Sequence, residues 1–243
     1  MENKKKYKSG ELHDSTQASQ YSDTHQLPHR FLAYRDFSKQ VKNLGNINKV
    51  LDFGSGTGAS TQVLFEKGYE VTGLDKSSDM VFQAKENFPH LNFDNTENLN
   101  NFSDFDMVFS SFVLFELSTK EEIVGYLNNA SAFLRHEGIF YGITGSENLH
   151  LKARDWMCFN VNFQENISPK SGDVVKLGLK ELAIEFHDYY WKEKDYKECF
   201  DLSDLELLQV HYPVGANEEP YAWKDELTTP PFVIFIAKKP NVA

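Results

Sequence analysis

One stretch of the sequence decides the fold: Lys49-Val50-Leu51-Asp52-Phe53-Gly54-Ser55-Gly56-Thr57-Gly58-Ala59-Ser60. Its first five residues are apolar and β-prone enough to form a buried strand. Three glycines at alternate positions then interrupt the strand, and the helical spacing of apolar residues resumes at Ala59. Because glycine has no Cβ, such a turn lets a ligand lie against the main chain at a helix N-terminus. The stretch therefore predicts a strand, a ligand-binding turn and a helix in succession.

A second predicted strand, Glu70 to Asp75, ends in a carboxylate. An acid at this tip, facing the glycine turn, can accept hydrogen bonds from both ribose hydroxyls of a nucleoside. A nicotinamide fingerprint would read G-x-G-x-x-G, whereas this chain reads G-x-G-x-G and carries Asp52 just before it. A carboxylate at Asp52 would repel a pyrophosphate, and a sulfonium ligand with an amino group has the opposite preference. The pattern favours a sulfonium nucleoside over a dinucleotide.

These motifs resemble those of the class I S-adenosylmethionine-dependent methyltransferases, whose first motif has the form acid-x-Gly-x-Gly-x-Gly. The resemblance covers Lys49 to Thr144 motif by motif, and the remainder only by layout. It implies an α/β fold with a doubly wound, mostly parallel seven-stranded sheet whose last strand is antiparallel, the Rossmann-like methyltransferase fold. It also implies S-adenosyl-L-methionine as cofactor and S-adenosyl-L-homocysteine as product.

The resemblance implies a cofactor site at the carboxyl ends of the strands. The glycine turn would contact the amino-acid moiety, and Asp52 would steer the turn or bind the amino group through water. Asp75 would bind the ribose, and side chains after each of the next strands would meet the adenine. An alternative register gives the adenine amino group to Asp94 instead of Asn95. The full set is Asp52, Gly54, Ser55, Gly56, Asp75, Lys76, Met80, Asn95, Thr96 and Ser111.

Composition and charge narrow the class of protein. The chain has 243 residues, 40% of them hydrophobic, which suits one α/β domain with a small lid. A formal net charge of -11 disfavours a nucleic-acid substrate, because phosphate binding needs a basic face. The sequence has no apolar run of membrane-spanning length and no Cys/His cluster with zinc spacing, so we expect neither a membrane span nor a metal. Two cysteines and no visible secretory signal favour the cytoplasm.

The predicted layout is a flexible tail, residues 1–24, followed by a single domain, residues 25–243. Within the domain we expect a lid helix at 25–45, a cofactor-binding half at 49–144 and an acceptor-side half at 145–243. Apolar residues recur at helical spacing between Tyr21 and Leu44, behind Pro28. This helix either covers the cofactor as a lid or merely caps the sheet. Its candidate lid residues are Tyr21, His25, His29, Arg30 and Tyr34.

The last hundred residues are expected to recognise the acceptor. Residues 147–159 are predicted to form a helix, and alternating residues over about 172–191 predict an inserted β-hairpin. The aromatic residues that end this hairpin either sandwich a planar or apolar acceptor or belong to the core. Tyr221 and Trp223, in the loop 213–231, either reach over the pocket or stay exposed. The candidate substrate-binding residues are Tyr21, Tyr34, Phe115, Tyr190 and Trp191.

The predicted reaction is methyl transfer to an O, N or C atom of a small-molecule acceptor by in-line displacement. A general base is needed only if the acceptor must first lose a proton. The candidates for that base are Glu116, His187, Tyr190 and His211. Two alternatives keep the fold: methylation of a protein or RNA, and binding of S-adenosylmethionine without catalysis. The oligomeric state stays open.

Overall fold

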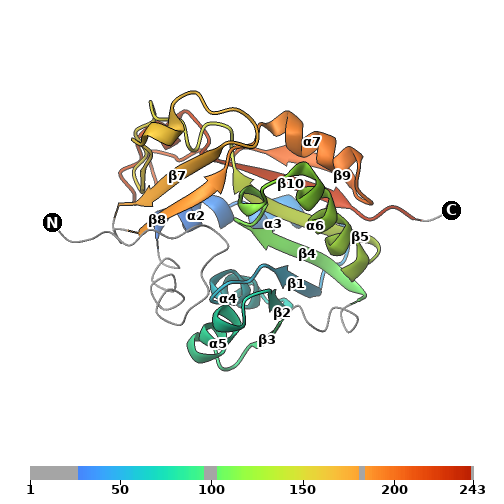
Figure 1. Cartoon of the computed structure of the whole chain (residues 1–243). Helices are drawn as coiled ribbons and strands as arrows, with labels where there is room; N and C mark the ends of the chain where they lie inside the picture. The colour runs from blue at the N-terminus through green and yellow to red at the C-terminus, as the bar shows by residue number, and fades with distance from the viewer. Residues whose placement is uncertain (1–26, 96–102, 181–183, 242–243) are drawn as a thin grey trace.

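The computed structural model describes residues 27–95, 103–180 and 184–241, and a seven-stranded sheet forms its centre (Figure 1). The strand order is β3-β2-β1-β4-β5-β10-β9. The strands are β1 (Lys49–Phe53), β2 (Glu70–Asp75), β3 (Asn92–Asn95), β4 (Phe105–Ser111), β5 (Leu134–Gly145), β9 (Glu206–His211) and β10 (Phe232–Lys238).

Strands β1 to β5 are parallel, and the last strand runs the other way. Residue Asp52 of β1 pairs with Gly73 of β2 on one side and with Phe109 of β4 on the other. Helices α4 (Ala59–Glu66), α5 (Ser78–Asn87) and α6 (Lys120–Phe133) lie between consecutive strands along the chain. Strand β10 pairs antiparallel with both β5 and β9. The prediction of a mostly parallel seven-stranded sheet with an antiparallel last strand is confirmed.

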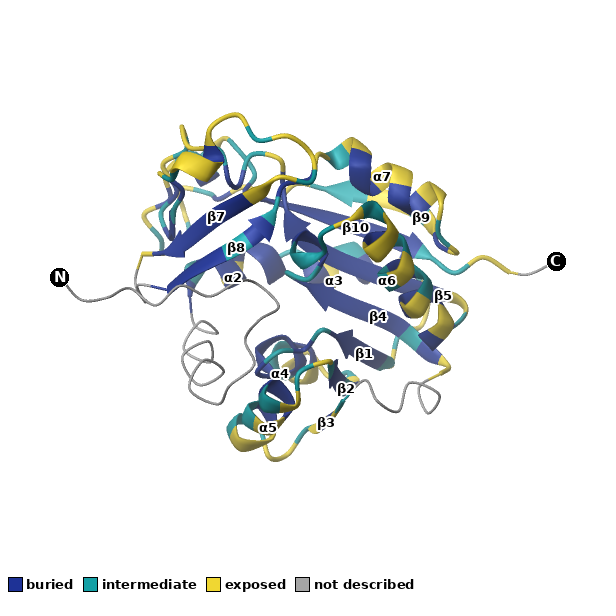
Figure 2. Cartoon of the chain, viewed as in Figure 1, coloured by how far each residue is buried: buried dark blue, intermediate teal, exposed yellow. Residues whose placement is uncertain are grey.

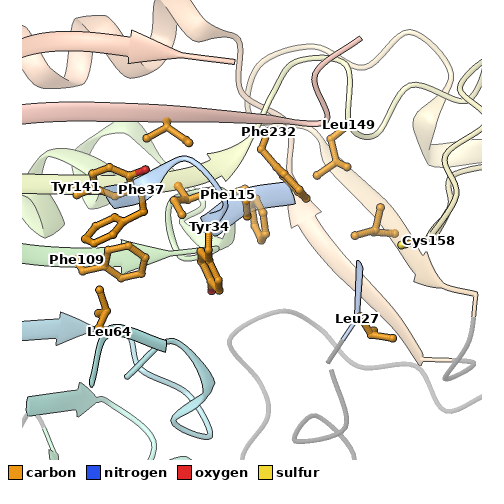
Figure 3. Packing of buried hydrophobic residues seen from close by; sticks show 14 of the residues in the cluster. Leu27, Tyr34, Phe37, Leu64, Phe109, Phe115, Tyr141, Leu149, Cys158 and Phe232 are labelled. Carbon is orange, nitrogen blue, oxygen red and sulfur yellow. The ribbon is translucent and has the colours of Figure 1, made fainter. Parts of the chain in front are cut away.

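Helices cover the sheet from both sides, because successive side chains of a strand point to opposite faces. Phe37 and Leu64 pack on one face in a cluster with Phe109 and Tyr141. The rings of Phe37, Phe109 and Tyr141 have centroids between 4.9 and 5.6 Å apart (Figure 3). Helices α6 and α7 (Glu193–Asp201) cover the other face, in a cluster with Val108 of β4. Figure 2 shows the central strands buried, and exposed outer surfaces on the helices that cover them.

The N-terminal helical segment consists of two short helices, α2 (Pro28–Tyr34) and α3 (Phe37–Val41), so the single helix predicted over 25–45 is wrong. The break falls at Asp36, whose ψ of -1° departs from the helical value. Neighbouring Arg35 forms ion pairs with Asp36 and with Glu219 of the 213–231 loop. Tyr21 and His25 lie outside the described residues.

A separate three-stranded sheet is inserted between β5 and α7. It comprises β6 (Phe159–Asn160), β7 (Val174–Leu179) and β8 (Ile184–Tyr189), and β7 and β8 form the antiparallel hairpin that the alternating sequence predicted. Figure 1 shows this hairpin beside the arrowheads of β4 and β5, where it contacts the short helix η3 (Leu114–Glu116). The insertion thus lies at the carboxyl ends of the central strands.

The helix predicted over 147–159 is wrong, because the chain there forms turns that lead into β6. Distant side chains satisfy the backbone in place of helical hydrogen bonds. The N–H of Met157 donates to Oε1 of Glu226 over 2.7 Å, and the indole N–H of Trp156 donates to the carbonyl of Leu149 over 2.7 Å. Helix α6 ends at Phe133, and β5 begins directly at Leu134, where it pairs with Phe105.

Candidate functional site

The glycine turn and the tip of β2 are joined by hydrogen bonds. The backbone N–H of Gly56 donates to Oδ2 of Asp75 over 2.8 Å, and the N–H of Ser77 donates to Oδ1 over 2.9 Å. The N–H of Gly54 donates to the carbonyl of Leu74 over 2.8 Å. Burial raises the pKa of Asp75, while the two amides act in the opposite direction. The two sequence motifs therefore form one structural unit.

Asp52 lies under this turn and is 0% exposed. Its Oδ2 accepts hydrogen bonds from the hydroxyls of Ser60, over 2.6 Å, and Thr61, over 2.7 Å, which are both in the first turn of α4. Its Oδ1 is buried and has no hydrogen-bond partner within the described part of the chain. Burial raises the pKa of Asp52 to about 6, against the opposing effect of the two hydroxyls. A buried carboxylate oxygen without a donor is a position that a cationic group can satisfy.

A cavity adjoins the glycine turn and is closed on one side by α2. Arg30 of α2 lines it, and the guanidinium donates to the hydroxyl of Tyr34 over 3.4 Å. That hydroxyl in turn bonds Oγ of Ser111, at the end of β4, over 3.0 Å. Burial raises the pKa of Tyr34, so the phenol stays protonated. The cavity is lined by Arg30, Gly54, Ser55, Gly56, Thr57, Ala59, Ser60, Ser111 and Phe112.

This arrangement suits the amino-acid end of S-adenosylmethionine. A zwitterion needs a cation for its carboxylate and an acceptor for its ammonium group, and Arg30 and Oδ1 of Asp52 supply that pair. The turn also requires glycine at position 54, because Gly54 adopts φ +82° and a Cβ there would lie 2.4 Å from Cγ2 of Val113. Sequence reasoning named Arg30 only as a lid residue, since nothing local predicts that α2 reaches the glycine turn.

The residues expected to contact the adenine differ in how far they are buried. Met80 is buried on α5, whereas Lys76 is exposed after β2. The amide of Asn95 donates to Oγ of Ser78 over 2.9 Å, and its backbone N–H donates to Oδ1 of Asp94 over 2.8 Å. Thr96 lies outside the described residues. The choice between Asp94 and Asn95 therefore stays open.

The candidate substrate residues separate into two groups. Tyr34 and Phe115 both lie close to Phe112, with ring centroids 6.4 Å and 6.2 Å from its ring. Trp191 packs instead in the cluster on the α6 and α7 face, and its indole N–H donates to the carbonyl of Leu117 over 3.0 Å. Tyr190 is buried, and burial raises its pKa. The aromatic end of the hairpin thus contributes to core packing at Trp191.

The candidate bases lie on η3, on β8 and just after it, and on β9. Glu116 is half-buried in η3, His187 is half-buried on β8, and His211 lies on the edge strand β9, where it bonds Gln209 over 3.0 Å. The structure instead reveals a buried pair that the sequence did not single out: Nε2 of His150 lies 2.9 Å from Oδ2 of Asp188, and the two residues are 2% and 1% exposed. The ring of His150 meets Phe115 edge to face at 6.2 Å.

The described ranges were compared with the requirements of a metal site and of a membrane span. Within residues 27–95, 103–180 and 184–241, no group of three or more His, Cys, Asp or Glu side chains could hold a metal ion. Among the helices of those ranges, none combines the length and the apolar character that crossing a bilayer requires.

Comparisons with known proteins agree with the geometry of the site. Residues 50–138 match the family model of a methyltransferase domain. A protein of Invertebrate iridescent virus 6 named "Putative methyltransferase 235L" is 27% identical over 143 residues. That match covers 55% of this chain and 54% of the viral protein, so the chain spans about half the length of the curated relative.

Solved structures of S-adenosylmethionine-dependent methyltransferases share the fold. One from Clostridium acetobutylicum has a TM-score of 0.61 at 15% identity, covering 89% of this chain and 94% of its own. One from Methanosarcina mazei has a TM-score of 0.61 at 20% identity, covering 84% and 98%. Residues 50–138 are therefore a methyltransferase domain within a Rossmann-like methyltransferase fold, and the names of these neighbours support S-adenosylmethionine as the cofactor.

Proposed function

We propose, from the premise that residues 50–138 are a methyltransferase domain, that the chain transfers the methyl group of S-adenosylmethionine to an O, N or C atom of a small-molecule acceptor. The observation that carries this proposal is the cavity at the glycine turn. There the guanidinium of Arg30 and Oδ1 of Asp52 lie at the glycine turn. Asp75 supports that turn by accepting a hydrogen bond from Gly56.

Each of these residues has a proposed part in binding. Arg30 would hold the carboxylate of the amino-acid moiety, and Asp52 would accept from its ammonium group. Asp75 would accept from the ribose hydroxyls. When bound, the cofactor supplies a methyl group that is already activated by its positively charged sulfur. The chain then contributes mainly orientation, which in favourable cases is worth roughly 7–11 kcal/mol.

Acid–base catalysis by the chain is not required for every acceptor. An amine that is already neutral can attack the methyl group directly, whereas a hydroxyl must lose its proton. The sequence candidates Glu116, His187, Tyr190 and His211 stay candidates for the acceptors that need a base. Orientation by the cofactor cavity and its neighbouring aromatic residues is therefore the larger part of the proposed mechanism.

A small acceptor is supported by the closure of the crevice. Helix α2 closes the cavity from one side, and the inserted sheet packs on Phe115 and Phe232 at the strand ends. The net charge of -11 supports the same choice over RNA. A cytoplasmic location is part of the proposal, supported by the two buried thiols of Cys158 and Cys199.

The test compares cofactors and acceptors on the purified full chain. Calorimetry should show binding of S-adenosylhomocysteine and no binding of NAD. Release of S-adenosylhomocysteine from S-adenosylmethionine should then require the low-molecular-weight fraction of a cell extract, with the Asp75→Ala variant as the inactive control. Binding of NAD alone contradicts the cofactor assignment. Turnover with only the protein or RNA fraction contradicts the acceptor assignment, and tight binding without any turnover indicates a binding module.

A further inference from the structure

His29 is a buried histidine that the proposed mechanism does not use. It lies on α2, next to Arg30, and is 8% exposed. Its Nδ1 is buried and finds no hydrogen-bond partner among the residues that the structure describes. Burial, with the positive charge of Arg30 adding to it, lowers the pKa of His29 to about 3. The imidazole is therefore uncharged under physiological conditions. Its Nδ1 can form a hydrogen bond with a bound molecule.

The surroundings of His29 are aromatic. Its ring centroid lies 5.2 Å from that of Phe159 in β6 and 6.1 Å from that of Phe112 after β4. Phe232, which begins β10, lies 5.2 Å from Phe112 and 6.1 Å from Phe159. With Phe115, 6.2 Å from Phe112, these four residues form what we call the phenylalanine cluster. Figure 3 shows Phe115 and Phe232 in the part of the core that contains Leu149 and Cys158.

Phe112 connects this cluster to the cofactor cavity. It lines the cavity together with Arg30 and Gly54, and its ring also meets His29. Its backbone adopts φ +62°, which is unusual for a bulky residue, and its N–H donates to the carbonyl of Ile143 over 2.8 Å. Strained backbone of this kind persists where surrounding structure holds it, frequently at a ligand site. Phe112 is thus the half-buried member through which the otherwise buried phenylalanine cluster adjoins the cofactor cavity.

We propose that the methyl acceptor is an uncharged molecule with a flat aromatic body and one hydroxyl or amino group, that its body packs against Phe112, the member of the phenylalanine cluster that lines the cofactor cavity, and that this polar group hydrogen bonds to Nδ1 of His29. This inference rests on the proposed methyl transfer. Aromatic rings favour offset or edge contacts with another ring, and a charged acceptor would lose its hydration among phenylalanines without a compensating ion pair.

His29 acts in this proposal as a positioning group for the acceptor. In the transfer, the bond from sulfur to methyl breaks with its electrons on sulfur, and the acceptor oxygen or nitrogen forms the new bond to carbon. The acceptor proton passes to solvent, because an imidazole with a pKa near 3 does not retain it. The result is S-adenosylhomocysteine and a methylated, neutral acceptor.

The test measures S-adenosylhomocysteine release by the wild-type chain with defined probes. The neutral aromatic probes are para-ethylphenol, beta-naphthol and para-ethylaniline, and the contrasting probes are para-hydroxybenzoate, ethanolamine and transfer RNA. We expect turnover with at least one neutral aromatic probe. For that probe His29→Leu should lower kcat/KM at least about tenfold, with the Kd for S-adenosylhomocysteine unchanged. His29→Asn, which keeps a hydrogen-bonding group, should retain more activity than His29→Leu.

Stability measurements separate positioning from a structural role. Because Nδ1 of His29 accepts from and donates to none of the described residues, His29→Leu should leave the Tm of the ligand-free chain unchanged or raise it. The exposed His90→Leu serves as the matched control and should change neither activity nor cofactor affinity. Three results overturn the inference: turnover only with the contrasting probes or with none, undiminished activity of His29→Leu, or a lower Tm and weaker cofactor binding in that variant. Failure of the wild-type chain to bind S-adenosylhomocysteine instead overturns the proposed function itself.

Discussion

Oδ2 of Asp75 accepts a hydrogen bond from the backbone N–H of Gly56 over 2.8 Å, although the two residues belong to different strand–turn units. The bond joins the carboxylate that ends β2 to the glycine turn that follows β1. Oδ1 of the same carboxylate accepts from the N–H of Ser77, so both oxygens are engaged and the side chain has a fixed orientation. The proposed ribose contact is therefore presented by a carboxylate that already supports the turn.

Replacing Asp75 by alanine should weaken the binding of S-adenosylhomocysteine by at least about tenfold, or ~1.4 kcal/mol. The variant loses both the proposed ribose acceptor and the support of the Gly56 amide. Isothermal titration calorimetry measures the change. Glu70→Ala, at the exposed opposite end of the same strand, is the control and should bind like the wild type. Unchanged affinity of Asp75→Ala would remove Asp75 from the site.

Replacing Gly54 by alanine should destabilise the ligand-free chain more than the same change at Gly68. Both glycines have positive φ, +82° and +91°, and left-handed backbone costs a residue with a Cβ roughly 1–2 kcal/mol. Gly68 has nothing within 4 Å of the new Cβ, whereas at Gly54 that atom would lie 2.4 Å from Cγ2 of Val113. Overpacking adds about 1–3 kcal/mol at Gly54. Urea unfolding of the two variants compares these costs, and equal losses of stability would show that Val113 moves away freely.

Replacing Asp52 by asparagine should stabilise the ligand-free chain at neutral pH while weakening cofactor binding. Burial raises the pKa of Asp52 from 3.8 to about 6, so between these values the folded chain holds a proton that the unfolded chain has released. This group's contribution to stability therefore falls as pH rises through that window, by up to ~3 kcal/mol. Asparagine does not titrate, so the free energy of unfolding of the variant does not fall in this way as pH rises.

Urea unfolding of Asp52→Asn and of the exposed control Asp201→Asn, below and above this pH window, measures the effect. The advantage of Asp52→Asn over the wild type should grow from acid to neutral pH, and Asp201→Asn should show no such trend. Affinity for S-adenosylhomocysteine should fall about tenfold or more for Asp52→Asn, because the proposed ammonium contact loses its charge. An advantage that is constant with pH would contradict the buried, titrating carboxylate.

The sequence predicts the parts of this protein whose signals are local. The glycine turn, the strand ending at Asp75 and the hairpin of β7 and β8 all follow from patterns that span a few residues. The prediction fails where distant residues decide the outcome. Residues 147–159 have helical spacing, but Glu226 accepts from the Met157 amide across 69 residues of sequence and the chain forms turns instead.

The part of the site that sequence analysis missed is also long-range. The hydroxyl of Tyr34 bonds Oγ of Ser111, 77 residues away in the sequence. Arg30 of the same helix lines the cavity at the glycine turn. The buried pair of His150 and Asp188 spans 38 residues, and no spacing rule connects them. Helix α2 could therefore be expected from its apolar pattern, but which of its side chains face the cavity follows only from the packed structure.

Replacing Arg30 by methionine should weaken binding of S-adenosylhomocysteine while leaving 5′-methylthioadenosine unaffected. Both ligands carry adenine, ribose and sulfur, but only the first carries the amino-acid carboxylate that we assign to the guanidinium. Methionine keeps much of the apolar stem, so α2 should retain its packing. A charge-assisted hydrogen bond contributes about 1.5–3 kcal/mol, which predicts a loss of about tenfold to a hundredfold for S-adenosylhomocysteine alone.

The control for this variant is Arg135→Met, whose guanidinium bonds Asp106 over 2.6 Å, near the backbone amide of Lys49 at the start of β1, away from the glycine turn. It should bind both ligands like the wild type. Calorimetry on the four combinations of variant and ligand separates two roles for Arg30. A loss confined to S-adenosylhomocysteine assigns the carboxylate contact to Arg30. Equal losses for both ligands would mean that Arg30 acts by holding α2 against the turn. 5′-Methylthioadenosine has no carboxylate, so its affinity cannot depend on a bond between Arg30 and that group.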